Sequence, residues 1–188
     1  VEKLADQPVD MLEINVSCPN VKHGGIAFGQ DPKCLFDITR EIKAKAKQPI
    51  IMKLSPNVTD ITEMAKAAEA AGSDALSLIN TITGMKIDIH KRTFALANKT
   101  GGLSGPAIKP VAVRMVYQAA KAVKIPIIGM GGIANAEDAI EFMLAGAVGV
   151  AVGAMNFVNP YTTVEVIKGI EDYMRQYDIQ DLGDIIGT

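Results

Sequence analysis

Residues 9–20 read Val-Asp-Met-Leu-Glu-Ile-Asn-Val-Ser-Cys-Pro-Asn and join a strand rich in apolar residues to a polar loop. The apolar residues predict a buried strand over Val9–Asn15. A thiol, Cys18, follows at the carboxyl end of that strand, which is where α/β enzymes place reactive groups. The amides of Asn15 and Asn20 flank it and suit a flat, polar heterocycle. The alternative is that Cys18 is a small buried hydrophobe, which leaves the flanking asparagines unexplained.

Strands and helices alternate along the rest of the chain. Apolar runs predict further strands over Ile50–Leu54, Ala75–Asn80, Ile125–Gly129 and Val148–Val152. Helix start signals between them are Asp31-Pro32, a capping box of Asp60 and Glu63, Pro110, Asn135 and Asn159-Pro160. This alternation predicts an α/β fold, in which helices cover a parallel sheet.

The segment between residues 84 and 105 departs from this alternation. Apolar and polar residues alternate on both sides of a polar turn at His90–Thr93, which predicts a β-hairpin laid over the strand ends. The glycine-rich run Gly101–Gly105 follows it. An insertion of this kind is usually a lid or a surface for a partner.

Two glycine sites follow the last two predicted strands. Gly131 and Gly132 come after the fourth strand, and Gly153 with Ala154 comes after the fifth. Glycine lets backbone N–H groups approach phosphate oxygens closely, and the amino end of a nearby helix favours the anion. In a (β/α)8 barrel the loops after the last two strands form the common phosphate pocket. The pattern therefore predicts a phosphate site, with tight turns that bind nothing as the alternative.

Lys53 lies inside an apolar strand, where a charged group needs a negative partner. We expect a phosphorylated flavin to supply that partner, because the reduced isoalloxazine carries negative charge near its N1 edge. The alternative is that the Lys53 side chain extends to solvent at the barrel mouth. Asn80 and Thr81 end the third predicted strand and add an amide and a hydroxyl at the same edge of the sheet.

The composition narrows the classes of function. The chain has 188 residues, of which 48% are hydrophobic, and a formal net charge of -2, which argues against nucleic acid as a partner. The sequence contains no run of about 18 apolar residues, so we expect no membrane span, and no leader is visible. Two cysteines make no disulfide framework, which predicts a reducing, cytoplasmic compartment. We take both histidines as solvated and predict no metal site.

Motifs along nearly the whole chain together resemble the dihydroorotate dehydrogenases. In family order they are Asn15-Val-Ser-Cys-Pro-Asn20, Lys22 with Gly24-Gly25 and Phe28-Gly29, Lys53-Leu-Ser-Pro-Asn57, Ile79-Asn-Thr81, Gly101-Gly-Leu-Ser-Gly105, Gly131-Gly132 and Gly153-Ala154. They are most similar to the catalytic subunit of the NAD-linked class 1B enzymes. The resemblance implies a (β/α)8 TIM barrel, which needs about 250 residues. We therefore expect an incomplete barrel of about five parallel strands with a β-hairpin insertion, a single domain over 1–188 that forms the carboxyl-terminal part.

The resemblance also implies a reaction, the oxidation of dihydroorotate to orotate through FMN in pyrimidine (UMP) biosynthesis. Cys18 would be the catalytic base that removes the proton from C5 while hydride passes from C6 to N5 of FMN. A thiol has an ordinary pKa of about 8.5, so a modest lowering makes it a usable base near neutral pH. The implied substrate contacts are Asn15, Asn20, Asn80 and Thr81. The implied flavin contacts are Asn15, Lys53, Ile79, Gly105, Gly131, Gly132, Gly153 and Ala154.

A partner is implied as well, an FAD and iron–sulfur subunit that passes electrons to NAD⁺, with a homodimer inside a heterotetramer. The hairpin over Met85–Leu96 is the candidate docking surface, and a plain lid is the alternative. Because the first three strands of the barrel would be missing, we expect this chain alone to bind FMN poorly and to turn over little dihydroorotate.

Two other functions stay open at this point. One is pyrimidine reduction of the dihydropyrimidine dehydrogenase type, which resembles this chain in its Asn-x-Ser-Cys-Pro and Lys-Leu-x-Pro-Asn-Val-Thr-Asp stretches. Asn20 argues against this function, because the similar stretch of that family has histidine at the position of Asn20. The other is a non-catalytic flavin- or phosphate-binding half-barrel.

Overall fold

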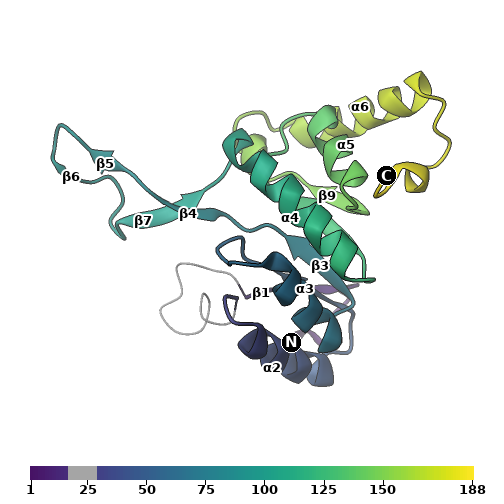
Figure 1. Cartoon of the computed structure of the whole chain (residues 1–188), viewed down its shortest axis with the longest axis horizontal. Coiled ribbons are helices and arrows are strands. Elements are labelled where there is room, and N and C mark those ends of the chain that lie inside the picture. The colour runs from purple at the N-terminus through teal and green to yellow at the C-terminus, as the bar shows by residue number, and fades with distance from the viewer. Residues whose placement is uncertain (17–28) are drawn as a thin grey trace.

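The computed structural model describes residues 1–16 and 29–188, which build a five-stranded parallel sheet flanked by helices (Figure 1). The strands lie side by side in the order β1-β2-β3-β8-β9. Each one pairs in parallel with its neighbour. Their bounds are Leu12–Asn15, Ile50–Lys53, Ala75–Leu78, Ile127–Met130 and Gly149–Ala151. The predicted α/β fold and its five parallel strands are confirmed.

Helices connect these strands as predicted. Their bounds are α2 Pro32–Lys45, α3 Ile61–Ala70, α4 Lys109–Ala122, α5 Ala136–Leu144 and α6 Thr162–Gln176, with 3-10 turns η1 Glu2–Leu4, η2 Pro106–Ile108, η3 Ala154–Phe157 and η4 Leu182–Ile185. Asp31, Asp60 and Asn135 cap α2, α3 and α5 by accepting from backbone N–H groups. Among the described residues, no helix is both long and apolar enough to cross a membrane.

The last helix begins later than the sequence predicts. Asn159 and Pro160 form the turn before α6 and are not its first residues. The Asn159 side chain accepts from the N–H of Tyr161 at 3.0 Å, and its carbonyl accepts from the N–H of Thr162 at 3.0 Å. An Asx turn therefore leads into the helix, as asparagine before proline often does.

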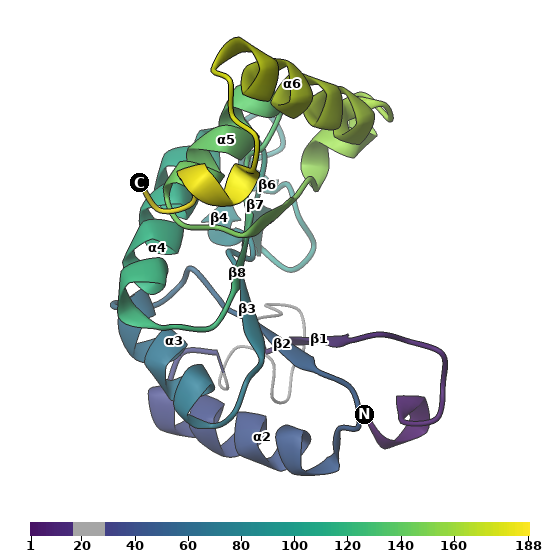
Figure 2. The same cartoon turned by 90° about the vertical axis from the view of Figure 1, so that its right-hand side faces the viewer.

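The sheet bends into an arc, and helices α2 to α5 cover its outer side (Figure 2). Side chains that face these helices, among them Met52, Leu76 and Leu78, are completely buried. Gly129 of β8 makes close packing possible, since a Cβ there would lie only 2.6 Å from Cδ1 of Phe142 on α5. Phe142 is itself fully buried. The outer side of the sheet is thus covered by the helices, and the polar side chains of the sheet lie on its inner side.

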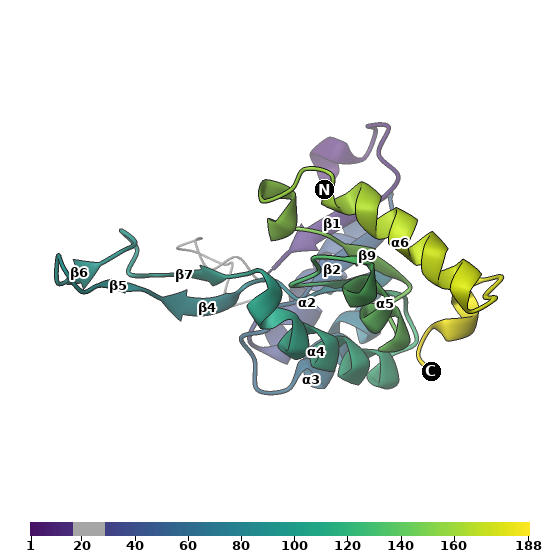
Figure 3. The same ribbon diagram turned by 90° about the horizontal axis from the view of Figure 1, so that it is seen from above.

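An antiparallel arm leaves the sheet after β3 and projects away from it (Figures 1 and 3). Strand β4 (Ile82–Met85) pairs with β7 (Thr100–Leu103), and β5 (Ile87–Asp88) pairs with β6 (Thr93–Phe94). The predicted hairpin is confirmed, but it is longer than expected, because most of the glycine-rich run is strand β7. It also extends away from the strand ends where we expected it to lie over them. A paired ribbon is stiff and continues in the direction its base gives it.

Candidate active site

A cavity of about 500 Å³ opens beside the carboxyl ends of the strands. The carboxyl ends of parallel strands meet at one edge of a sheet, so residues far apart in the sequence come together there. Nine of its lining residues were predicted from the sequence to contact substrate or flavin: Lys53, Ile79, Asn80, Thr81, Gly105, Gly131, Gly132, Gly153 and Ala154. The fold therefore gathers these residues around one space, as their predicted roles require.

Asn15 reaches this group through a neighbour. It ends β1, and its Oδ1 accepts a hydrogen bond from Nδ2 of Asn80 at 3.3 Å. The Asn80 side chain also accepts from the N–H of Thr81 at 2.7 Å. The three predicted polar contacts thus form a connected edge of amides and hydroxyl. The other two predicted site residues, Cys18 and Asn20, lie outside the described residues.

Lys53 has a negative partner within the chain itself. Its Nζ lies 3.1 Å from Oε1 of Glu13, which is on the neighbouring strand β1. The other oxygen of Glu13 accepts from Oγ of Ser77 on β3 at 2.8 Å. From the sequence we expected a bound flavin to be this partner, and Glu13 was not among the predicted site residues. The Lys53 ammonium is therefore already paired with a carboxylate on the inner side of the sheet, without a bound ligand.

The glycines of the cavity have two different physical roles. At Gly132, with φ of +84°, a Cβ would lie 2.9 Å from both the Gly105 carbonyl oxygen and the Lys109 nitrogen, so backbone packs directly on backbone. At Gly105 and Gly153 a Cβ would meet nothing within 4 Å. Since both of these residues line the cavity, a side chain there would occupy space that a ligand could use. A small anion held by backbone N–H groups fits this arrangement.

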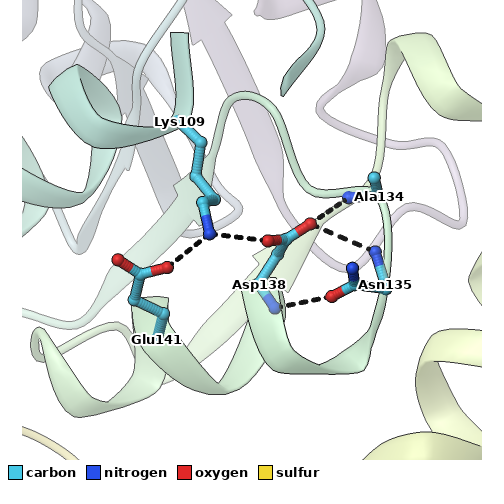
Figure 4. A network of polar contacts seen from close by, with 5 residues as sticks. All are labelled: Lys109, Ala134, Asn135, Asp138 and Glu141. Atoms are coloured by element: carbon cyan, nitrogen blue, oxygen red, sulfur yellow. Dashed lines mark hydrogen bonds and ion pairs between the residues drawn. The ribbon is translucent and has the colours of Figure 1, made fainter. Parts of the chain in front are cut away.

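A charged brace ties the loop after β8 to the beginning of α4 (Figure 4). The Lys109 ammonium lies 2.7 Å from Oδ1 of Asp138 and 2.6 Å from Oε2 of Glu141. The second oxygen of Asp138 accepts from the N–H groups of Ala134 and Asn135. Asp138 and Asn135 also complete a reciprocal capping box. The brace fixes the loop that follows Gly131 and Gly132.

The electrostatics of the brace favour its charged form. Burial is the largest influence on Asp138 and acts to raise its pKa. Hydrogen bonds from Lys109 and from backbone N–H groups outweigh it and hold the pKa below its ordinary value. Hydrogen bonds to Asp138 and then to Glu141 raise the pKa of Lys109. Asp138 and Lys109 are therefore both ionised near neutral pH.

The brace changes one expectation about the phosphate site. From the sequence we expected the helix after the first glycine pair to supply a favourable dipole, but the amino end of α5 already faces the Asp138 carboxylate. The cavity wall instead runs along Gly131 to Ile133 and resumes at Ala151, and it includes Gly105 and Ile108 at the start of α4. On this side of the cavity, the glycine loops and the residues at the amino end of α4 are thus the groups that could face a phosphate.

Two further residues with polar contacts at the site, Asn57 and Glu13, were not assigned from the sequence. Asn57 donates from Nδ2 to the carbonyl of Thr81 at 3.2 Å and accepts at Oδ1 from the N–H of Thr83 at 2.9 Å. It therefore holds the chain where β3 passes into the arm. Glu13 could have been found by the argument that singled out Lys53, because it too is a charge between apolar strand residues. The partner of Lys109 could not, because Asp138 lies 29 residues away.

Comparisons with known proteins show which family the sequence matches. The family model for dihydroorotate dehydrogenase matches residues 1–174. The catalytic subunit of dihydroorotate dehydrogenase B (NAD(+)) from Lachnoclostridium phytofermentans is 72% identical over 100% of this chain and 62% of its own length. That from Alkaliphilus oremlandii is 64% identical over 99% of this chain and 62% of its own length. The chain thus spans about three-fifths of the length of these relatives.

The arrangement of the backbone is similar to that of a solved member. A crystal structure of DHODH from Eimeria tenella in complex with ferulenol superposes with a TM-score of 0.78 at 25% sequence identity. The match covers 95% of this chain and 54% of that one. The five-stranded arc with its covering helices is accordingly part of a TIM barrel. By sequence, fold and the residues gathered at its strand ends, this chain belongs to the dihydroorotate dehydrogenase family.

Proposed function

We propose that the protein oxidises dihydroorotate to orotate through FMN in UMP biosynthesis, with electrons passed on to NAD⁺. The observation that carries this proposal is the convergence of Lys53, Asn80 and three glycine loops on one cavity at the strand ends. The names of the relatives support the reaction, and the glycine loops support a phosphorylated cofactor. The motifs around Asn15 and Lys53 follow the order of the NAD-linked class.

The residues present fit FMN. Gly105, Gly131, Gly132, Gly153 and Ala154 would hold its phosphate, since a Cβ at two of these glycines would fill cavity space. Lys53 and Ile79 would lie along its ring. When bound, FMN would supply the electron-accepting chemistry that amino-acid side chains lack. The chain supplies the cradle, a polar edge and a cation.

The polar edge suits the pyrimidine. Asn15 and Asn80, already bonded to each other, present amide donors and acceptors that match the N–H and C=O groups of dihydroorotate. Thr81 adds a hydroxyl, and Asn20 would complete the set. Cys18 follows β1 by three residues and would take the C5 proton. A thiol whose pKa is lowered by its surroundings can do this near neutral pH.

The test uses the chain extended to the full length of its relatives, which we call the completed chain. Its rate of dihydroorotate oxidation tests the proposal. We expect stoichiometric FMN, read from visible absorbance, and oxidation of dihydroorotate. Cys18→Ala should slow turnover by about 10²-fold or more while FMN content stays the same, because it removes only the base. Unchanged turnover in that variant would favour the non-catalytic half-barrel. Reduction of uracil in place of dihydroorotate oxidation would favour the dihydropyrimidine dehydrogenase alternative.

We further propose an electron-transfer partner carrying FAD and an iron–sulfur cluster, with a homodimer inside a heterotetramer, acting in the cytoplasm. The name "catalytic subunit" of the relatives supports the existence of a partner. The arm over Met85–Leu96 is the candidate docking surface, because it projects from the sheet and exposes apolar residues such as Ile89. Pull-down of the partner by the completed chain should be lost when the arm is shortened and kept when only its base is altered.

A further inference from the structure

The cavity wall carries one ammonium and one carboxylate that face each other, those of Lys53 and Glu13. Of the described residues that line the cavity, these two are the charged ones, so this part of the wall carries no net charge. The two groups lie 3.1 Å apart. Opposite charges this close cancel much of each other's field a few ångströms away. A ligand in the cavity therefore meets a paired ammonium and not an isolated one.

Three strands hold Glu13 in this position. It precedes Asn15 by two residues on β1, which places both side chains on the same face of the sheet. The register pairs Asn15 with Lys53, and Lys53 with Ser77. Glu13 therefore reaches diagonally across β2, with one oxygen on Lys53 and the other on the hydroxyl of the fully buried Ser77. Rotation of the carboxylate would break one of these two bonds.

We propose that Glu13 is a positioning residue that compensates the charge of Lys53. It thereby sets how strongly the site prefers reduced over oxidised FMN. This rests on the proposed binding of FMN beside Lys53. An isolated ammonium at that place would stabilise the reduced, anionic ring over the oxidised, neutral one. The Glu13 carboxylate weakens that preference, which keeps the bound cofactor able to pass electrons on to the next acceptor.

The midpoint potential of FMN bound to the completed chain measures this preference. Equilibration with a reference dye gives the ratio of the affinities for reduced and oxidised FMN. Glu13→Gln keeps the size of the side chain and can still bond to Lys53, but it removes the negative charge. We expect the ratio to rise about tenfold, which for a two-electron couple is about 30 mV.

Matched variants separate charge from structure. Glu13→Asp and Ser77→Ala keep the carboxylate charge, so the ratio should stay within about threefold of the parent value. Lys53→Met removes the cation and should lower the ratio. If Glu13→Gln binds FMN with an unchanged ratio, the inference is overturned and the proposed function stands. If the completed parent chain takes up no FMN, the proposed function fails, and this inference fails with it.

Discussion

At the scale of single residues, the site depends on where a side chain is absent and on which charges are paired. Glycine permits the backbone contacts at the proposed phosphate cradle, and carboxylates pair with Lys53 in the cavity wall and with Lys109 at the start of α4. Gly132 illustrates the first point, and Asp138 the second. Both can be tested one residue at a time.

Gly132→Ala should destabilise the chain by about 1–3 kcal/mol, because the residue has φ of +84° and its new Cβ would lie 2.9 Å from backbone atoms of Gly105 and Lys109. The midpoint of urea unfolding measures the change. Gly149→Ala is the matched control, since a Cβ there meets nothing within 4 Å and the backbone is ordinary. Equal effects at the two positions would contradict this account of the cradle.

Asp138→Asn should destabilise the chain at pH 7 by about 1–3 kcal/mol, because a largely buried carboxylate loses its ionic bond to Lys109. The lowered pKa of Asp138 means that its contribution is present above the pKa of the unfolded state, about 3.9. It is lost as the pH falls through the folded-state pKa. Urea midpoints should therefore differ between parent and variant at pH 7 and converge in acid.

The half-exposed Glu141 provides the comparison for that experiment. Glu141→Gln removes the other ion pair of Lys109, yet solvent screens it, so the expected cost is about 0.5 kcal/mol or less. A constant gap between parent and Asp138→Asn at every pH would show that the carboxylate charge is not what stabilises the loop.

At the scale of elements, the arm and the sheet have separate sources of stability. The sheet is held by apolar side chains buried under helices, whereas the far end of the arm exposes its apolar residues, with Ile89 75% exposed and Ile87 48% exposed. The base of the arm is anchored by Asn57. The two parts should therefore respond differently to deletion.

Replacement of residues 87–94 by an Asn-Gly turn should change the free energy of unfolding by about 1 kcal/mol or less, because little buried apolar surface is lost. Thermal and urea unfolding measure it. Asn57→Ala, at the base, should cost more, since it leaves the Thr81 carbonyl and the Thr83 N–H without this partner. A large loss on shortening the arm would mean that it contributes to the core.

At the scale of the whole molecule, the sheet is an open arc. Strands β1 and β9 lie at its two ends, and the chain spans 62% of the length of its relatives. Apolar side chains are exposed near the β9 end: Phe157, Val158, Tyr161, Val164 and Ile167. Open strand edges and exposed apolar surface both favour association.

The chain alone should therefore associate with itself as its concentration rises, and the completed chain should do so much less. Sedimentation velocity over a range of concentrations measures this. The completed chain should associate less because its additional strands would pair with the open edges of β1 and β9, which are otherwise available to another molecule. A chain that stays monomeric at every concentration would show that its edges are protected in some other way.

The chain alone should also bind FMN weakly, because its five parallel strands form an open arc and not a closed barrel around the cavity. Titration followed by flavin fluorescence gives the dissociation constant, and the completed chain is the control. Riboflavin, which lacks the phosphate, should lose less affinity than FMN when Gly132→Ala is introduced into the completed chain. Tight, stoichiometric FMN uptake by the chain alone would contradict this prediction.

Much of the fold follows from local patterns. The apolar runs locate all five parallel strands, although each predicted run extends beyond its observed strand at one end or both. Asp31, Asp60 and Asn135 mark the helix starts. The hairpin is found by its alternation, but its length is not, because glycines read as a loop while their pairing with β4 is a contact across the arm. Local patterns indicate the residue types but not which strands pair across the arm.

The sequence by itself determined the family, the order of the elements and most of the residues that line the cavity, because these depend on short motifs and on the periodicity of apolar residues. Only the tertiary structure decided how charges are paired. Glu13 meets Lys53 and Asp138 meets Lys109 because neighbouring strands and helices bring them together across 40 and 29 residues of chain. It also decided that the arm projects away from the sheet, with the base of the arm held by hydrogen bonds to the Asn57 side chain.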